Sequence, residues 1–157
     1  MTSAFKQNLI GSFKQHFGDD LVAVVLFGSQ ARGEAGPESD YDIFLLVKNL
    51  PARPVERLLF VRGAIAVKFA EKIAILARTP EEFESGFPSL YLDLAVDGIV
   101  LYDTDNYVTK KLQRIQEIIK QAGLERKKLD HQLSWEWNKQ PKGQWEITWE
   151  GYRELKD

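Results

Sequence analysis

The stretch LFGSQARGEAGPESDYDIFLLV, residues 26–47, decides how this chain folds. It joins a short, valine-rich apolar run at residues 21–27 to a second apolar run that ends at Val47. Both runs have the length and composition of buried β-strands, and the twelve residues between them, 28–39, are rich in turn formers. A connector of this length is barely long enough for a parallel crossover and suits antiparallel neighbours joined through a short helical turn. We therefore expect the end of the first strand beside the start of the second.

Two acidic side chains, Asp40 and Asp42, stand at the entrance of the second strand. Residues two apart on a strand share a face and lie about 6.7 Å apart. At an effective dielectric constant of about 20, two negative charges at that distance repel each other by about 2.5 kcal/mol, and a bound cation reverses this cost. Magnesium takes one or two carboxylates together with phosphate oxygens, and a pair of such ions can clamp an in-line phosphoryl displacement. Asp40 and Asp42 are therefore candidate metal ligands.

The turn at the end of the first strand supplies the features of a phosphate site. Gly28 lets the backbone approach a triphosphate closely, and the amides that follow it can donate hydrogen bonds. Ser29 adds a hydroxyl group and Arg32 adds a cation. A lone Gly-Ser pair is usually a plain turn and a lone Asp-x-Asp is usually a solvated strand start, but at this spacing the two predict one metal and triphosphate site. The turn is not a P-loop, because Glu34 stands where that motif needs lysine.

Residues 26–33 followed by residues 39–43 resemble the minimal nucleotidyltransferases of the DNA polymerase β superfamily, whose signature is Gly-Ser, ten residues and Asp-x-Asp. The resemblance is close over residues 22–47 and looser as far as Tyr102. It implies an α/β (α+β) nucleotidyltransferase fold, with a small mixed sheet flanked by helices. It also implies transfer of a nucleoside monophosphate, such as AMP, from ATP or another nucleoside triphosphate onto a hydroxyl group of a protein or small molecule. The implied cofactor is Mg²⁺, as two ions.

The same resemblance implies roles for single residues and a partner. Asp40 and Asp42 would be the catalytic residues and would hold the metal, while Gly28 and Ser29 would hold the triphosphate. Members of the family are often antitoxins paired with HEPN-type toxins, some of which receive AMP, so a HEPN-type toxin protein is the implied partner.

One departure from the family pattern keeps a second function open. The third carboxylate of the family usually lies within the third strand, but residues 72–77 contain no acid, and only Glu71, just before them, could serve. Loss of that group would weaken catalysis and leave nucleotide binding intact. The alternative is a catalytically weak or inactive module that neutralises a partner protein by contact.

The rest of the chain predicts the elements around this site. We expect helices at residues 3–17, 55–68, 89–96 and 106–122, a helix start at Pro80, and strands at residues 72–77 and 99–102. The nucleotidyltransferase domain is expected to span residues 1–123. Residues 124–157 are expected to form an extension with a helical start and then a tryptophan-rich β-hairpin that pairs residues 133–137 with residues 145–149. Its four tryptophans are expected to pack against the domain, and the basic cluster at residues 126–128 is expected to be solvated.

Composition narrows the function classes. With 157 residues the chain fits one domain and a short appendage, and the absence of cysteine excludes disulfides, zinc fingers and thiol nucleophiles. His16 and His131 are far apart in sequence and are interpreted as ordinary helix residues. A net charge of −2 gives no broad basic field for a nucleic acid. The apolar runs are too short for a membrane span or a signal peptide, so we expect a cytoplasmic protein without a membrane partner.

Overall fold

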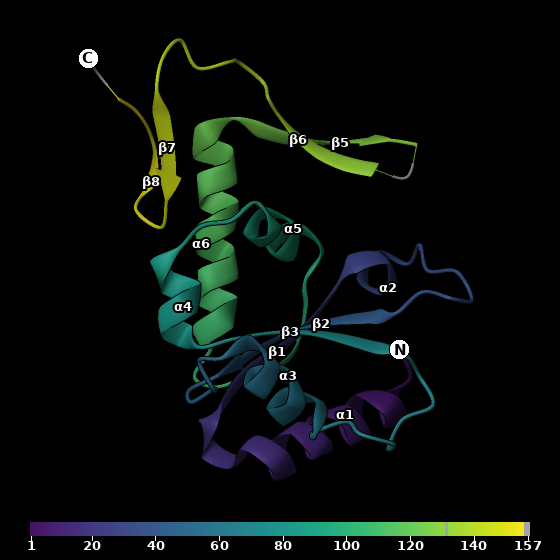
Figure 1. The fold of residues 1–157 in the computed structure, drawn as a ribbon. Coiled ribbons are helices and arrows are strands. Elements are labelled where there is room, and N and C mark those ends of the chain that lie inside the picture. Colours follow the sequence, from purple (N-terminus) through teal and green to yellow (C-terminus); the bar gives the residue numbers. More distant parts are fainter. Residues whose placement is uncertain (131, 156–157) are drawn as a thin grey trace.

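The two apolar runs of residues 26–47 and their flanks form the two central strands of a four-stranded sheet. A computed structural model describes residues 1–130 and 132–155 of the chain. The strand order is β3-β2-β1-β4, with β1 (Leu21–Phe27), β2 (Tyr41–Val47), β3 (Ile73–Arg78) and β4 (Ile99–Asp103) (Figure 1). β1 is antiparallel to β2 and β4, whereas β2 and β3 are parallel. The expected mixed sheet is confirmed, and so is the antiparallel placement of the two runs, which a short helix, α2 (Gly28–Arg32), connects.

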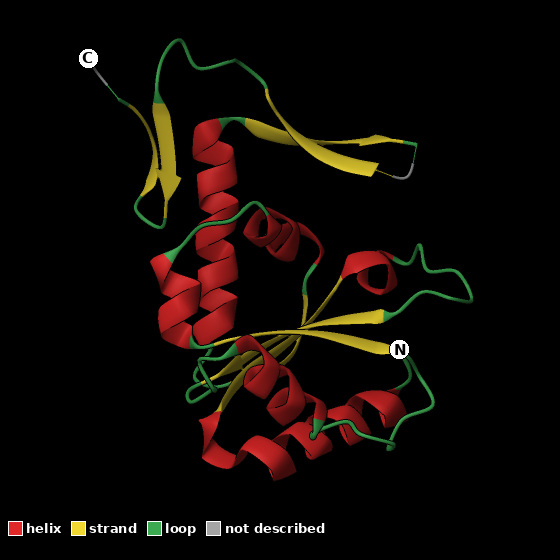
Figure 2. Ribbon diagram, viewed as in Figure 1, coloured by secondary structure: helices red, strands yellow, loops and turns green. Residues whose placement is uncertain are grey.

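Helices cover both faces of the sheet (Figure 2). On one face lie α1 (Ser3–Phe17), followed by a short 3-10 turn, η1 (Gly18–Asp20), and α3 (Pro54–Arg62). On the other face lie α4 (Pro80–Ser85), α5 (Leu90–Asp97) and α6 (Tyr107–Ala122). Alternate residues of β2 enter the two cores: Ile43 and Leu45 pack with α1, whereas Phe44 and Leu46 pack with α4, α5 and α6. Asp42 therefore belongs to the face that carries α5.

The third helix is shorter than its sequence predicts. The expected helix over residues 55–68 ends at Arg62, and residues 63–68 form turns. After Gly63 the backbone bonds change to the tighter i to i−3 pattern, from Ala64 to Val61 and from Ile65 to Arg62. That change of hydrogen-bond pattern ends the α-helix although the apolar residues continue.

The C-terminal extension consists of strands from its first residue. Residues 124–129, expected as a helical start, are instead β5 (Leu124–Leu129), because Gly123 in the left-handed conformation (φ 67°) ends α6. The expected pairing of residues 133–137 with 145–149 is also wrong. β6 (Gln132–Trp137) pairs with β5, and β7 (Trp145–Thr148) pairs with β8 (Gly151–Glu154), so the extension holds two hairpins. The division of the chain at residue 123 stays a prediction.

Trp135 and Trp149 pack against the core of the domain, as expected, whereas Trp145 is 46% exposed. Trp149 lies against Phe83 and Phe87, with ring centroids 5.0 and 5.1 Å away, and its indole N–H donates to the carbonyl oxygens of Phe83 and Gly86. Trp137 and Trp145 join the two hairpins edge to face at 4.9 Å. His16 lies in α1, whereas His131 is outside the described residues. Within the described part of the chain, every helix is too short or too polar to cross a membrane.

Candidate functional site

The register between β1 and β2 brings the Gly-Ser turn onto the second aspartate. Phe27, the last residue of β1, pairs with Asp42, so the next residue, Gly28, lies against the Asp42 side chain. Gly28 has a φ of +74°, and a Cβ at this position would overlap the Asp42 carboxylate. Two features therefore require glycine at position 28: the backbone has a positive φ, and the Asp42 carboxylate occupies the space that a side chain would need. No side chain caps the start of α2, which begins at this glycine.

The two aspartates interact electrostatically. Asp40 is exposed just before β2, and Asp42 is half-buried at its start. Burial raises the pKa of Asp42, the charge of Asp40 raises it further, and the charge of Arg32 opposes both. A cation between the two carboxylates would relieve this unfavourable accumulation of negative charge. The glycine turn lies beside Asp42, and the charge of Asp40 acts on the same carboxylate.

The position beside Asp42 on the other side is taken by an alanine. In the parallel ladder of β2 and β3, the register partner of Asp42 is Ala74, whose side chain is exposed. Glu71 does not replace the missing acid, because it lies on the opposite face, in a hollow lined by Thr2 and Phe5 of the α1 side. Among residues 1–130 and 132–155 no group of three or more His, Cys, Asp or Glu side chains could hold a metal ion. The site thus has two carboxylates.

Arg32 lies near the aspartates but is engaged by other acids. Its guanidinium donates to Glu34 at 3.2 Å and to Asp97 at 3.1 Å. Asp97, at the end of α5, is only 6% exposed. Burial alone would raise the pKa of Asp97, but the hydrogen bonds from Arg126 and Arg32 outweigh it and hold this pKa below its ordinary value.

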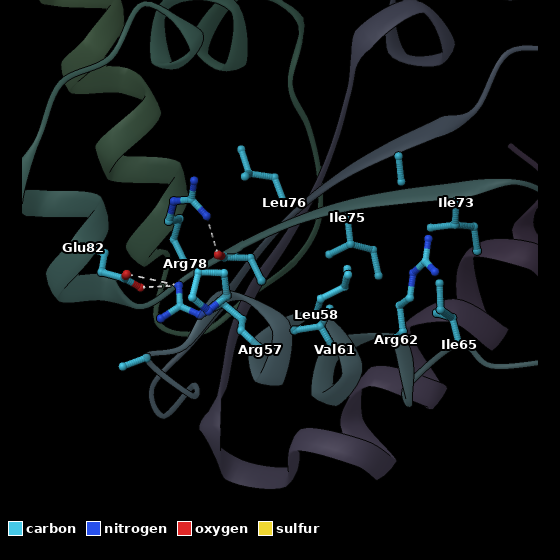
Figure 3. Close-up of a pocket in the computed structure, with 14 residues that line it drawn as sticks. Arg57, Leu58, Val61, Arg62, Ile65, Ile73, Ile75, Leu76, Arg78 and Glu82 are labelled. Carbon is cyan, nitrogen blue, oxygen red and sulfur yellow. Dashed lines mark hydrogen bonds and ion pairs between the residues drawn. The ribbon is translucent and has the colours of Figure 1, made fainter.

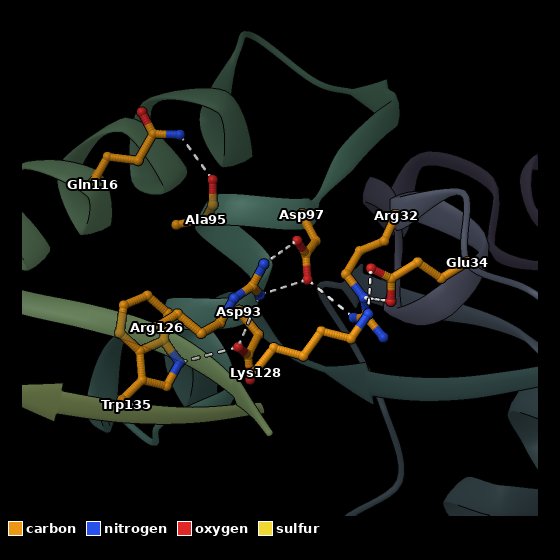
Figure 4. Close-up of polar contacts among 9 residues, drawn as sticks. All are labelled: Arg32, Glu34, Asp93, Ala95, Asp97, Gln116, Arg126, Lys128 and Trp135. Carbon is orange, nitrogen blue, oxygen red and sulfur yellow. Dashed lines mark hydrogen bonds and ion pairs between the residues drawn. The ribbon is translucent and has the colours of Figure 1, made fainter. Parts of the chain in front are cut away.

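Arg32 is one end of an ion-pair network that sequence reasoning missed (Figure 4). Arg126 on β5 donates two hydrogen bonds of 2.7 Å to the carboxylate of Asp97 and one of 3.2 Å to Asp93. Trp135 on β6 also donates to Asp93, at 3.1 Å, and Lys128 pairs with Glu34 at 3.0 Å. The expectation that the basic cluster at residues 126–128 is solvated is therefore wrong for Arg126, whereas Lys128 is exposed and also forms an ion pair. The network ties the β5–β6 hairpin to α2 and α5.

The arrangement as a whole has a definite chemical capacity. Carboxylates at one strand start can hold a hard cation, and the adjoining glycine turn leaves the backbone open to a polyanion. Arg32 adds positive charge within range of Asp42. These features together suit the binding of a cation with a phosphorylated ligand.

Comparison with known proteins agrees with this geometry. The family model for the nucleotidyltransferase domain matches residues 6–146. A relative from Methanocaldococcus jannaschii, "Putative protein adenylyltransferase MJ1305", is 32% identical over 128 residues, which are 76% of this chain and 87% of the relative. A second protein of that organism with the same description, MJ0141, is 36% identical over 52 residues, 32% of this chain and 52% of the relative.

Solved structures share the fold. One is a toxin–antitoxin structure with AMP-PNP, with a TM-score of 0.55 and 16% identity over 73% of this chain and 86% of the other. Another is the complex of a tri-AMPylated Shewanella oneidensis HEPN toxin with its MNT antitoxin, with a TM-score of 0.51 and 14% identity over 76% of this chain and 87% of the other. At these identities the likeness extends to the fold alone.

Proposed function

This chain belongs to the nucleotidyltransferase domain family, and from that premise we propose that it transfers AMP from ATP to a hydroxyl group of an acceptor protein. The observation that carries the proposal is the pairing of Phe27 with Asp42, which sets the Gly28 turn against a carboxylate. Phosphoryl transfer depends chiefly on the positioning of a triphosphate and the neutralisation of its charge.

Each residue of the site has a distinct task in this proposal. Asp40 and Asp42 are the catalytic residues and hold Mg²⁺, as two ions by the family resemblance. Their mutual repulsion and the raised pKa of Asp42 support a fit to a divalent cation, because a cation removes both costs. When bound, the metal neutralises phosphate charge. Gly28 and Ser29 bind the triphosphate through backbone amides and a hydroxyl group, and Arg32 provides positive charge beside them.

The acceptor that we propose is a HEPN-type toxin protein, with this chain as its antitoxin. The description of the 32% identical relative as a protein adenylyltransferase supports a protein acceptor. The AMPylated HEPN toxin bound to a chain of this fold supports the partner class. The proposed setting is the cytoplasm, as expected from the sequence.

One observation favours a second candidate, a binding module that neutralises its partner by contact. Ala74 stands beside Asp42, where a third acid would complete a three-carboxylate site. Two carboxylates are enough to bind a metal and a nucleotide, but neither is then spare to deprotonate the attacking hydroxyl.

Incubation with Mg²⁺, ATP labelled at the α-phosphate and a HEPN-type protein tests the first candidate. We expect label on the protein with the wild-type chain and none with Asp42→Asn. Asp105→Asn, outside the site, is the matched control. Equal transfer by Asp42→Asn and the wild type would refute the proposal. Neutralisation of the partner that survives Asp40→Asn, without transfer, would select the binding module.

A further inference from the structure

A groove of about 700 Å³ runs along the outer edge of the sheet, between β3 and α3 (Figure 3). Its lining is half apolar, with apolar side chains from both elements, among them Leu58, Val61, Ile73 and Ile75. Large apolar side chains of α3 are open to solvent, with Leu58 51% and Leu59 67% exposed. Such an apolar surface at the rim of a sheet is typical of a binding site.

The groove lies against a strand whose outer side has no partner. β3 is the last strand of the order β3-β2-β1-β4, and in the part of the chain that the structure describes no strand pairs with its outer side. About half of its backbone N–H and C=O groups therefore have no partner on a neighbouring strand. Proteins usually cover or charge such an edge, and an extended peptide can bind to one by adding a strand.

The groove and the catalytic site meet at the edge of the sheet, because the apolar residues of the groove belong to the α3 face whereas Asp42 belongs to the α5 face. Ala74 lines the groove and is also the register partner of Asp42. The Gly28 turn lies on the other side of Asp42, since Phe27 pairs with Asp42 from β1. In AMP transfer the hydroxyl oxygen bonds to the α-phosphorus and loses its proton, while the bond from that phosphorus to the bridging oxygen breaks and pyrophosphate leaves. In an in-line displacement the attacking and leaving oxygens are on opposite sides of the phosphorus. If the triphosphate lies over the Gly28 turn, the attacking hydroxyl arrives from the side of β3, the strand that borders the groove.

The charges in the groove indicate the chemistry of its occupant. Arg62 lies near Ile73 at one end and Arg78 lies near Glu82 at the other (Figure 3). Arg57 is paired with Glu82 at 2.9 Å, but among residues 1–130 and 132–155 no carboxylate forms an ion pair with Arg62 or Arg78. Arg78 does donate a hydrogen bond of 2.8 Å to the carbonyl oxygen of Ala77. Two guanidinium groups without an acidic partner, beside apolar side chains, are complementary to an acidic, partly apolar segment.

We propose that an extended acidic and apolar segment of the acceptor protein adds to the free edge of β3 and so delivers its hydroxyl group to Asp42. The inference rests on the proposed function and names how its substrate docks. The six residues of β3, Ile73–Arg78, span about 17 Å, so the docked segment is about six residues long.

Binding without nucleotide tests the groove separately from catalysis. A HEPN-type protein is titrated by calorimetry with the wild type, Leu58→Asp and Arg62→Glu. We expect each substitution to weaken binding about tenfold or more, because one places a charge among the apolar side chains of the groove and the other reverses the complementary charge. Ile99→Asp is the matched control, since Ile99 is 46% exposed on β4, the opposite edge strand, and its substitution should leave binding unchanged. Unchanged binding by both groove variants would overturn the inference.

Hydrogen exchange tests the strand addition itself. On binding, the amides of residues 73–78 should exchange more slowly, and an unchanged rate there would overturn the proposed mode of docking. Sedimentation of the chain alone gives a further test, because a dimer that Leu58→Asp dissociates would assign the groove to a second copy instead. Failure of the proposed function looks different: the wild type then transfers no label, while binding still depends on Leu58 and Arg62.

Discussion

Asp97 at the end of α5 and Arg126 on β5 form a bidentate ion pair with two hydrogen bonds of 2.7 Å. Through Asp97, the β5–β6 hairpin is connected to α2, the helix that begins with the Gly-Ser turn. The connection exists because the same carboxylate also accepts a hydrogen bond of 3.1 Å from Arg32 in α2. Two elements far apart in sequence thus share one almost buried acid. The hairpin is in this way part of the support of the candidate site.

Because Arg32 and Arg126 share the carboxylate of Asp97, we expect its removal to lower the free energy of unfolding substantially. Asp97→Ala leaves two guanidinium groups, 22% and 16% exposed, next to each other without their common partner. Removal of one member of a buried ion pair typically costs about 3 kcal/mol. We expect a loss of that order in the free energy of unfolding, measured with urea. Glu117→Ala, which removes the acid of an exposed pair with Arg114, should cost less than about 1 kcal/mol. Equal losses for the two variants would contradict the prediction.

The lowered pKa of Asp97 predicts a pH dependence of stability. A carboxyl group with a folded-state pKa below its unfolded value of about 3.9 stabilises the protein when ionised, and this contribution is complete at neutral pH. It declines from about pH 5 downward as protons bind, and is lost once the pH falls through the folded-state pKa. Unfolding free energies measured from pH 7 to pH 3 should therefore fall more steeply for the wild type than for Asp97→Asn. Parallel curves would rule out this role for Asp97.

The two glycines that begin and follow α2 offer a matched comparison. Gly28 and Gly33 have nearly the same φ, +74° and +73°, but only Gly28 has a side chain, that of Asp42, within 4 Å of an added Cβ. Both Gly→Ala substitutions cost about 1–2 kcal/mol for the left-handed backbone. Gly28→Ala must also displace the carboxylate, so we expect it to unfold at a lower temperature than Gly33→Ala and to abolish AMP transfer. If both variants transfer AMP as the wild type does, the close approach of Gly28 to Asp42 has no functional importance.

We expect the ionised carboxylate of Asp42 to lower the stability of the folded protein although metal binding requires it. Its raised pKa means that the ionised carboxylate destabilises the folded protein at neutral pH, through burial and then through the charge of Asp40. Asp42→Asn removes this cost, so the metal-free variant should melt at a higher temperature than the wild type. Added Mg²⁺ should raise the melting temperature of the wild type and not that of the variant. A lower melting temperature for the metal-free variant would show that the carboxylate stabilises the fold.

Much of this site could be predicted from local sequence because its parts are local. The Gly-Ser turn and the Asp-x-Asp pair lie at the two ends of the connector between β1 and β2, residues 28–40, and a connector of that length allows few arrangements. The same holds for α1, whose apolar residues repeat at a four-residue spacing and are all buried. The periodicity and turn chemistry agree there with the tertiary structure.

The parts that could not be predicted depend on contacts between distant residues. Residues 126–128 form a basic cluster that is typical of a solvated surface, and only the fold brings Asp93 and Asp97 to Arg126. The hairpin pairing of the extension was wrong for a related reason: two strands with alternating tryptophans match each other in pattern, but each has a nearer partner in sequence, which costs less loop-closure entropy.

The last prediction decides between the enzyme and the binding module. Ala74 faces solvent beside Asp42, so Ala74→Asp places a third carboxylate at the site without filling a buried space. If the chain catalyses transfer with two acids, the added group can help to orient or deprotonate the attacking hydroxyl, and the transfer rate in Mg²⁺ should rise about tenfold or more. Ala74→Asn is the matched control for the added volume and should not accelerate transfer. If Ala74→Asp transfers no AMP and the partner is still neutralised, the binding module is favoured. In that case Asp40, Asp42 and the glycine turn do not catalyse transfer even when a third carboxylate is supplied.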